Sequence, residues 1–118
     1  MRPEVSAFVA DGPLPGEETG EEAEIDRRAR QLDAIPRPLS LAEAEALAGC
    51  FGPDDGYGLA WTVAHLIETA PGPVPTSAPA PGGGAHARIH RWAVAAGLVA
   101  EGSEAVARGG GDGGAFPA

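Results

Sequence analysis

One stretch of the chain holds the residue types that could do chemistry. The run DDGYGLAWTVAHLIETAPG, residues 54–72, contains the six candidate site residues Asp54, Asp55, Tyr57, Trp61, His65 and Glu68. His65 and Glu68 are three positions apart, a spacing that puts both side chains on one face of a helix and lets them share a proton. The chain has no GxSxG motif, and Cys50 has no predictable base. We therefore predict no catalytic residue and expect the protein not to be an enzyme.

The same residues fit two non-catalytic interpretations. On a helical wheel, one stripe about 100° wide is apolar and predicts a core-facing side; it contains Leu59, Val63, Leu66, Ile67 and Ala70. The other side carries Tyr57, Trp61, Ala64, His65 and Glu68. If the helix is buried on both sides, the two aromatic rings belong to the core. If it is not, they form an exposed aromatic patch with an acidic rim, where a basic partner protein would bind. The extent to which Trp61 is buried distinguishes these two interpretations.

His86 and His90 form a second set of candidates, because a spacing of four on a helix lets two imidazoles bind one metal ion. The HExxH motif is absent, since position 87 is Ala, and a third ligand would have to come from Glu68 or His65. We predict no cofactor and no bound metal. A small metal-binding protein or metal-dependent enzyme that uses His86, His90 and a carboxylate is the alternative function.

Capping and stop signals predict four helices. The Thr19–Glu22 capping box opens a helix that runs to about Ile35, and the Ser40–Glu43 box opens a second that Gly49, Gly52 and Pro53 end. Asp54 or Asp55 would cap the third, which ends near residues 68–70 before a proline. The fourth would span residues 85–100. No segment alternates like a strand, so we predict an all-α fold, a small four-helix bundle.

The 118 residues are one domain at most. We predict a flexible arm over residues 1–16, marked by three prolines and a glycine, and a single helical domain over residues 17–100. Within that domain, residues 71–84 are rich in Pro and Gly and predict a loop. Residues 101–118 predict a mostly disordered Gly-rich tail.

The net charge and the composition limit the classes of partner that the protein could bind. The net charge of −9 argues against nucleic acid, whose affinity for proteins depends mainly on Lys and Arg, and against an anionic membrane surface. It favours a basic protein. The basic residues are all Arg, and Ala, Gly and Pro abound, as in proteins from GC-rich bacterial genomes. With one cysteine, and no stretch typical of a signal peptide or a membrane span, we expect the bacterial cytoplasm.

The leading hypothesis is a small acidic, non-enzymatic protein-binding module. Its most concrete version is an inhibitor or immunity-type protein for a basic enzyme such as a nuclease, because an acidic face can occupy a cationic active site built for phosphate. Bulky apolar residues are few, so a homodimer that completes the core is a further possibility. A chain with no binding site at all is the third alternative.

Overall fold

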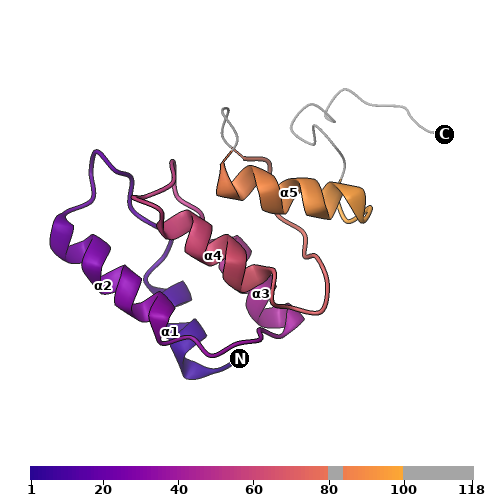
Figure 1. The fold of residues 1–118 in the computed structure, drawn as a ribbon, viewed down its shortest axis with the longest axis horizontal. Coiled ribbons are helices and arrows are strands. Elements are labelled where there is room, and N and C mark those ends of the chain that lie inside the picture. Colours follow the sequence, from indigo (N-terminus) through magenta and orange to yellow (C-terminus); the bar gives the residue numbers. More distant parts are fainter. Residues whose placement is uncertain (80–83, 100–118) are drawn as a thin grey trace.

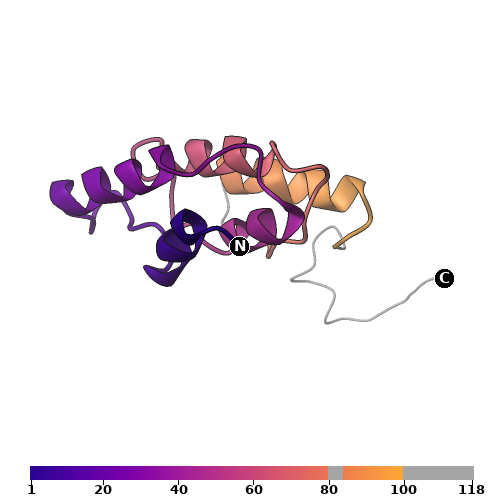
Figure 2. The same cartoon turned by 90° about the horizontal axis from the view of Figure 1, so that it is seen from below.

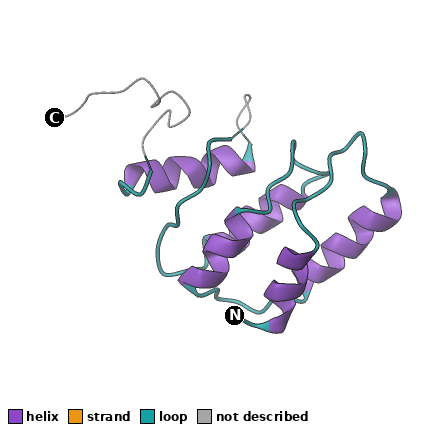
Figure 3. Ribbon diagram, turned by 180° about the vertical axis from the view of Figure 1, so that it is seen from behind, coloured by secondary structure: helices purple, strands orange, loops and turns teal. Residues whose placement is uncertain are grey.

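The computed structural model describes residues 1–79 and 84–99, and Figure 1 shows their arrangement. Within these ranges the chain forms five helices and no strand (Figure 3). The helices are α1 (Pro3–Ala10), α2 (Glu22–Asp33), α3 (Leu41–Ala48), α4 (Leu59–Ile67) and α5 (Ala85–Ala95). The predicted all-α class is therefore confirmed. No helix in these ranges is both long and apolar enough to cross a membrane.

The helices form two layers. Helices α2, α4 and α5 lie side by side in one layer, and α1 and α3 form the other (Figure 2). Helix α4 packs against α2, α3 and α5, so it is the central helix. The apolar stripe predicted for it is buried, each side chain being at most 9% exposed: Leu59, Val63, Leu66, Ile67 and Ala70. The helical wheel therefore assigned these five residues to the core correctly. Ala64, which it placed on the opposite side, is also fully buried, so the buried side of α4 is wider than predicted.

The predicted arm contains a helix. Residues Pro3–Ala10 form α1, and Val5 and Phe8 are fully buried between α2 and α3. The prediction of irregular chain was wrong here because Pro3 was taken as a helix breaker. Proline at the first helical position is favourable, since its missing N–H would have had no partner there.

A buried arginine connects α1 to α2. The Arg28 side chain is 1% exposed, and its guanidinium lies 4.1 Å from the centre of the Phe8 ring. Its Nη2 donates to the carbonyls of Phe8 and Gly12 at 3.2 and 2.8 Å, at the C-terminal end of α1. A cation at this end also suits the helix dipole. Burial lowers the pKa of this guanidinium, yet these contacts keep α1 in place.

The two predicted capping boxes have different outcomes. Ser40 and Glu43 form theirs, with hydrogen bonds of 2.9 and 3.1 Å, and Arg2 adds a two-pronged contact to the Glu43 carboxylate. Thr19 caps nothing: α2 begins at Glu22 without a side-chain cap. The chain turns before it, where the Gly20 N–H donates to the Gly16 carbonyl at 2.7 Å.

Helix α5 is shorter than predicted. It ends at Ala95 because Gly97 adopts a left-handed φ of 77°, as is common just after a helix, and the Leu98 N–H turns back to the Ala93 carbonyl. Residues 71–79 form no helix or strand, as predicted, but Val74 and Thr76 within them are buried. The predicted tail over residues 101–118 lies outside the described residues.

Candidate functional site

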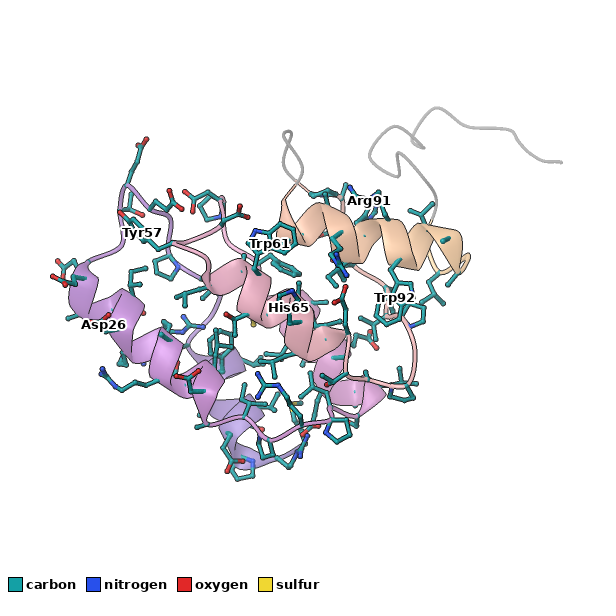
Figure 4. The ribbon with its side chains drawn as sticks, in the orientation of Figure 1. Asp26, Tyr57, Trp61, His65, Arg91 and Trp92 are labelled. Atoms are coloured by element: carbon teal, nitrogen blue, oxygen red, sulfur yellow. The ribbon has the colours of Figure 1, made fainter. Side chains whose placement is uncertain are left out.

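The six candidate residues do not form one patch. Trp61, His65 and Glu68 lie on one stripe of α4, at positions i, i+4 and i+7. Tyr57 precedes the helix and lies apart from them, beside the loop that leads into α2 (Figure 4). The helical wheel placed Tyr57 with Trp61 because it assumed that Asp54 or Asp55 caps the helix. That assumption is wrong, since α4 begins at Leu59 after the N-cap Gly58.

The turn before α4 replaces the predicted cap. Gly56, Tyr57 and Gly58 all have left-handed backbones, with φ values of 55°, 56° and 92°. The Asp55 carbonyl, not a carboxylate, accepts the N–H groups of Gly58 and Ala60. The Asp54 carboxylate is occupied elsewhere: it accepts the Gly56 N–H at 2.9 Å and the Glu17 N–H at 3.0 Å. Asp54 thus joins this turn to the loop before α2.

Tyr57 is held firmly and is nevertheless exposed. Its N–H donates to the Glu17 carboxylate at 2.9 Å, and its hydroxyl donates to the Glu17 carbonyl at 3.0 Å. Its side chain is 65% exposed, the largest such fraction among the aromatic residues described. A non-glycine residue in the left-handed region costs about 1–3 kcal/mol, and such residues concentrate at binding and catalytic sites. This aromatic ring is therefore presented to solvent in one orientation.

Tyr57 lies in an acidic part of the chain, between Glu17, which it contacts, and Glu22, which lines the same pocket. We name residues 16–26 and 53–58, which the Glu17 hydrogen bonds hold together, the acidic tip. These segments contain no basic residue and eight of the 17 acidic residues of the chain: Glu17, Glu18, Glu21, Glu22, Glu24, Asp26, Asp54 and Asp55. Asp55 borders α5, since a Cβ on Gly84 would lie 2.8 Å from its Oδ1. The tip therefore has a local excess of negative charge, although Glu24 pairs with Arg27, and such an excess favours a cationic partner.

The tip also contains a pocket. A cavity of about 320 Å³ opens between the loop and α2, lined by Gly20, Glu22, Ile25 and Tyr57. A Cβ on Gly20 would lie only 2.9 Å from the Gly16 carbonyl oxygen, so the loop closes tightly beneath the pocket. Sequence reasoning missed Glu17, Glu22 and Ile25 as site residues. The run of acidic residues over positions 17–26 was the available signal, but only the fold places it beside Tyr57.

The other three candidates lie along the surface between α4 and α5. Trp61 is half-buried, packs against the core, and lies 6.4 Å from the exposed His65 ring, centroid to centroid. Arg88 of α5 forms an ion pair with Glu68. Trp92, Arg88, Arg91 and Glu68 line an open hollow of about 510 Å³. Trp61 is thus neither fully buried nor fully exposed, and the nearby hollow beside Trp92 carries both acidic and basic residues.

The two α5 histidines have different surroundings. His86 stacks on Phe51 at 4.7 Å with nearly parallel rings, and its Nε2 lies 2.9 Å from the Ser77 carbonyl and 3.1 Å from the Thr76 hydroxyl. Burial lowers the pKa of His86. His90 is 8% exposed, and its Nδ1 has no hydrogen-bond partner among the described residues. Within residues 1–79 and 84–99, no group of three or more His, Cys, Asp or Glu side chains could hold a metal ion.

Comparisons of the chain with protein-family models, with curated proteins and with solved structures give no match. The function is therefore inferred from the residues and geometry of this chain.

Proposed function

We propose that the protein is a non-enzymatic protein-binding module whose acidic tip docks on a basic surface of another protein. The observation that carries this proposal is Tyr57, an exposed aromatic residue with a left-handed backbone, whose N–H and hydroxyl both donate to Glu17 within the acidic tip. The binding surface predicted from the sequence was Asp54, Asp55, Tyr57, Trp61, His65 and Glu68. The proposal narrows that surface to the tip, because Trp61, His65 and Glu68 lie on a separate surface.

Two physical arguments support docking at the tip. Tyrosine is enriched among the residues that dominate binding energy at interfaces, and a ring already fixed in place loses little entropy when a partner covers it. The surrounding carboxylates accelerate the encounter with a basic partner and select against acidic ones. Asp54 serves this site by holding the turn, because both of its carboxylate oxygens accept main-chain N–H groups within the tip.

The most specific form of the proposal is an inhibitor or immunity-type protein for a basic enzyme such as a nuclease. A nuclease active site is lined with cations that bind phosphates, and closely spaced carboxylates can occupy it in their place. The single, buried Cys50 has no disulfide partner, which suits a reducing bacterial cytoplasm.

A matched pair of charge variants tests the proposal. The probe is the basic protein that the wild-type chain captures from its native cells, purified and measured in a direct binding assay. Glu18→Lys reverses one exposed tip charge, and Asp33→Lys makes the same change at the far end of α2. We expect Glu18→Lys to weaken binding at least about tenfold and Asp33→Lys less than about threefold. Tyr57→Asn, which suits a left-handed backbone, should weaken binding at least about thirtyfold, as for a hot-spot residue.

The contrary results are equally specific. Equal effects of Glu18→Lys and Asp33→Lys would mean that only net charge matters, and full binding by Tyr57→Asn would remove the tip as the docking site. Circular dichroism melts of each variant check that the fold is retained. If the captured protein cleaves nucleic acid, addition of this protein should stop the cleavage at one-to-one stoichiometry.

A further inference from the structure

The pocket in the acidic tip has features that a flat docking surface does not need. Its lining residues are Gly20, the apolar Ile25, the aromatic Tyr57 and the acidic Glu22. Among the residues that the structure describes, Glu22 forms no ion pair or side-chain hydrogen bond, whereas the nearby Glu24 pairs with Arg27. The pocket therefore combines an apolar residue, an aromatic residue and an unpaired acidic residue (Figure 4 labels Tyr57 and, within α2, Asp26).

We propose that this pocket receives an arginine side chain of the basic partner. The inference rests on the proposed function and adds the chemistry of the group that is recognised. The aliphatic part of the arginine would pack on Ile25, its guanidinium would lie against the Tyr57 ring, and Glu22 would accept its hydrogen bonds. A volume of about 320 Å³ is sufficient for one such side chain.

The protein uses the same pairing within its own core. There the Arg28 guanidinium lies 4.1 Å from the centre of the Phe8 ring while its N–H groups donate to oxygen acceptors. Arginine suits such a place better than lysine, because its planar guanidinium is weakly hydrated and can stack on a ring while it donates in plane. Lysine would have to give up a more tightly held hydration shell. The preference for arginine is thus a consequence of the apolar walls.

Three short blocked peptides test the inference without any knowledge of the partner. They have the form acetyl-Gly-X-Gly-amide, where X is arginine, citrulline or lysine; citrulline keeps the shape of arginine and removes its charge. Binding is followed by NMR through the amide signals of Gly20, Ile25 and Tyr57. We expect the arginine peptide to shift these signals, the citrulline peptide to bind at least about tenfold more weakly, and the lysine peptide about threefold more weakly.

Two isosteric variants separate the pocket from the general acidity of the tip. Glu22→Gln removes the carboxylate at the pocket, and Glu21→Gln removes its neighbour, which does not line the pocket. We expect Glu22→Gln to weaken the arginine peptide at least about fivefold and Glu21→Gln at most about twofold. Equal losses, a lysine peptide that binds as tightly as arginine, or shifts outside the pocket would each overturn the inference.

The failure of this inference is distinguishable from the failure of the proposed function. If Tyr57→Asn abolishes partner binding while the arginine peptide leaves the NMR signals of the pocket unchanged, docking at the tip is supported and the arginine pocket is refuted. If the peptide binds in the pocket but Tyr57→Asn still holds the captured protein, the pocket stands and that protein docks elsewhere.

Discussion

The buried guanidinium of Arg28 offers the sharpest test of the fold. We consider Arg28→Met, which keeps much of the side-chain length and removes the charge and the donors. The variant loses the hydrogen bonds to the Phe8 and Gly12 carbonyls and the contact with the Phe8 ring. The Phe8 carbonyl would still accept the Asp11 N–H, whereas the Gly12 carbonyl loses the Arg28 donor.

The magnitude follows from opposing terms. A hydrogen bond from a charged donor contributes about 1.5–3 kcal/mol, and a desolvated cation–π contact about 2 kcal/mol. Burying the charged guanidinium costs several kcal/mol, and the methionine variant avoids this cost. We therefore expect Arg28→Met to lower the free energy of unfolding by about 2–4 kcal/mol, which lowers the Tm by at least about 8 °C in a domain of this size.

Urea and thermal unfolding, followed by circular dichroism, measure the effect. Arg30→Met is the matched control, because Arg30 is exposed on the same helix and has no ion pair among the described residues; it should change stability by less than about 0.5 kcal/mol. Arg28→Lys keeps the charge but loses the two-pronged geometry and should fall between the two. Hydrogen exchange should show α1 losing protection first. The reasoning is refuted if Arg28→Met is as stable as Arg30→Met.

Three further predictions follow from titratable groups. Hydrogen bonds from Arg2 hold the pKa of Glu43 far below its usual 4.5. The Glu43 carboxylate therefore contributes its full stabilisation above pH 4.5, and this contribution declines as the pH falls below that value. In urea unfolding measured from about pH 7 to pH 3, Glu43→Gln should reduce the fall of the midpoint at acid pH. Burial lowers the pKa of His86 from 6.5, so the unfolded chain binds a proton at a higher pH than the folded protein does. Stability therefore declines as the pH falls below 6.5 towards the pKa of the folded protein. His86→Gln should make the urea midpoint depend less on pH over this range. Burial raises the pKa of the Cys50 thiol, so a thiol reagent should label the native protein at least about 100-fold more slowly than the urea-unfolded chain; equal rates would contradict its burial.

Self-association stays a prediction. The core closes within one chain in the described residues, with side chains such as Phe8, Leu32 and Leu47 fully buried. The half-buried Trp61 and Trp92 at the surface between α4 and α5 are the apolar area that a second copy would cover. Sedimentation velocity at several concentrations measures this directly.

The sequence predicted those features whose causes lie within a few residues. Apolar spacing over residues 59–70 identified the core side of α4, because helical geometry alone decides which side chains share a face. The Ser40–Glu43 capping box was readable for the same reason, since both hydrogen bonds close within one turn. The helical stretch Pro3–Ala10 was readable too, from Val5 and Phe8 three apart after a proline, but the proline was given the wrong weight.

The site itself depended on contacts that no local pattern contains. The sequence predicted Asp54 as a helix cap. Its carboxylate instead accepts the N–H of Glu17, which lies 37 positions earlier in the chain. Tyr57 looked like a helical neighbour of Trp61, but hydrogen bonds to Glu17, 40 positions away, stabilise it in a left-handed turn. Local sequence propensity predicted that α4 starts earlier than it does, because propensity takes no account of hydrogen bonds from residues distant in the sequence.

The sequence by itself determined that the protein is helical, acidic and built around the apolar stripe of α4, since periodicity, capping and charge are properties of neighbouring residues or of the whole composition. Only the tertiary structure decided that the acidic run before α2 meets the turn before α4. That meeting turns scattered carboxylates and one tyrosine into a tip with a pocket. The physical reason is that a binding surface is made by residues close in space, and long-range packing alone decides which parts of the chain become neighbours.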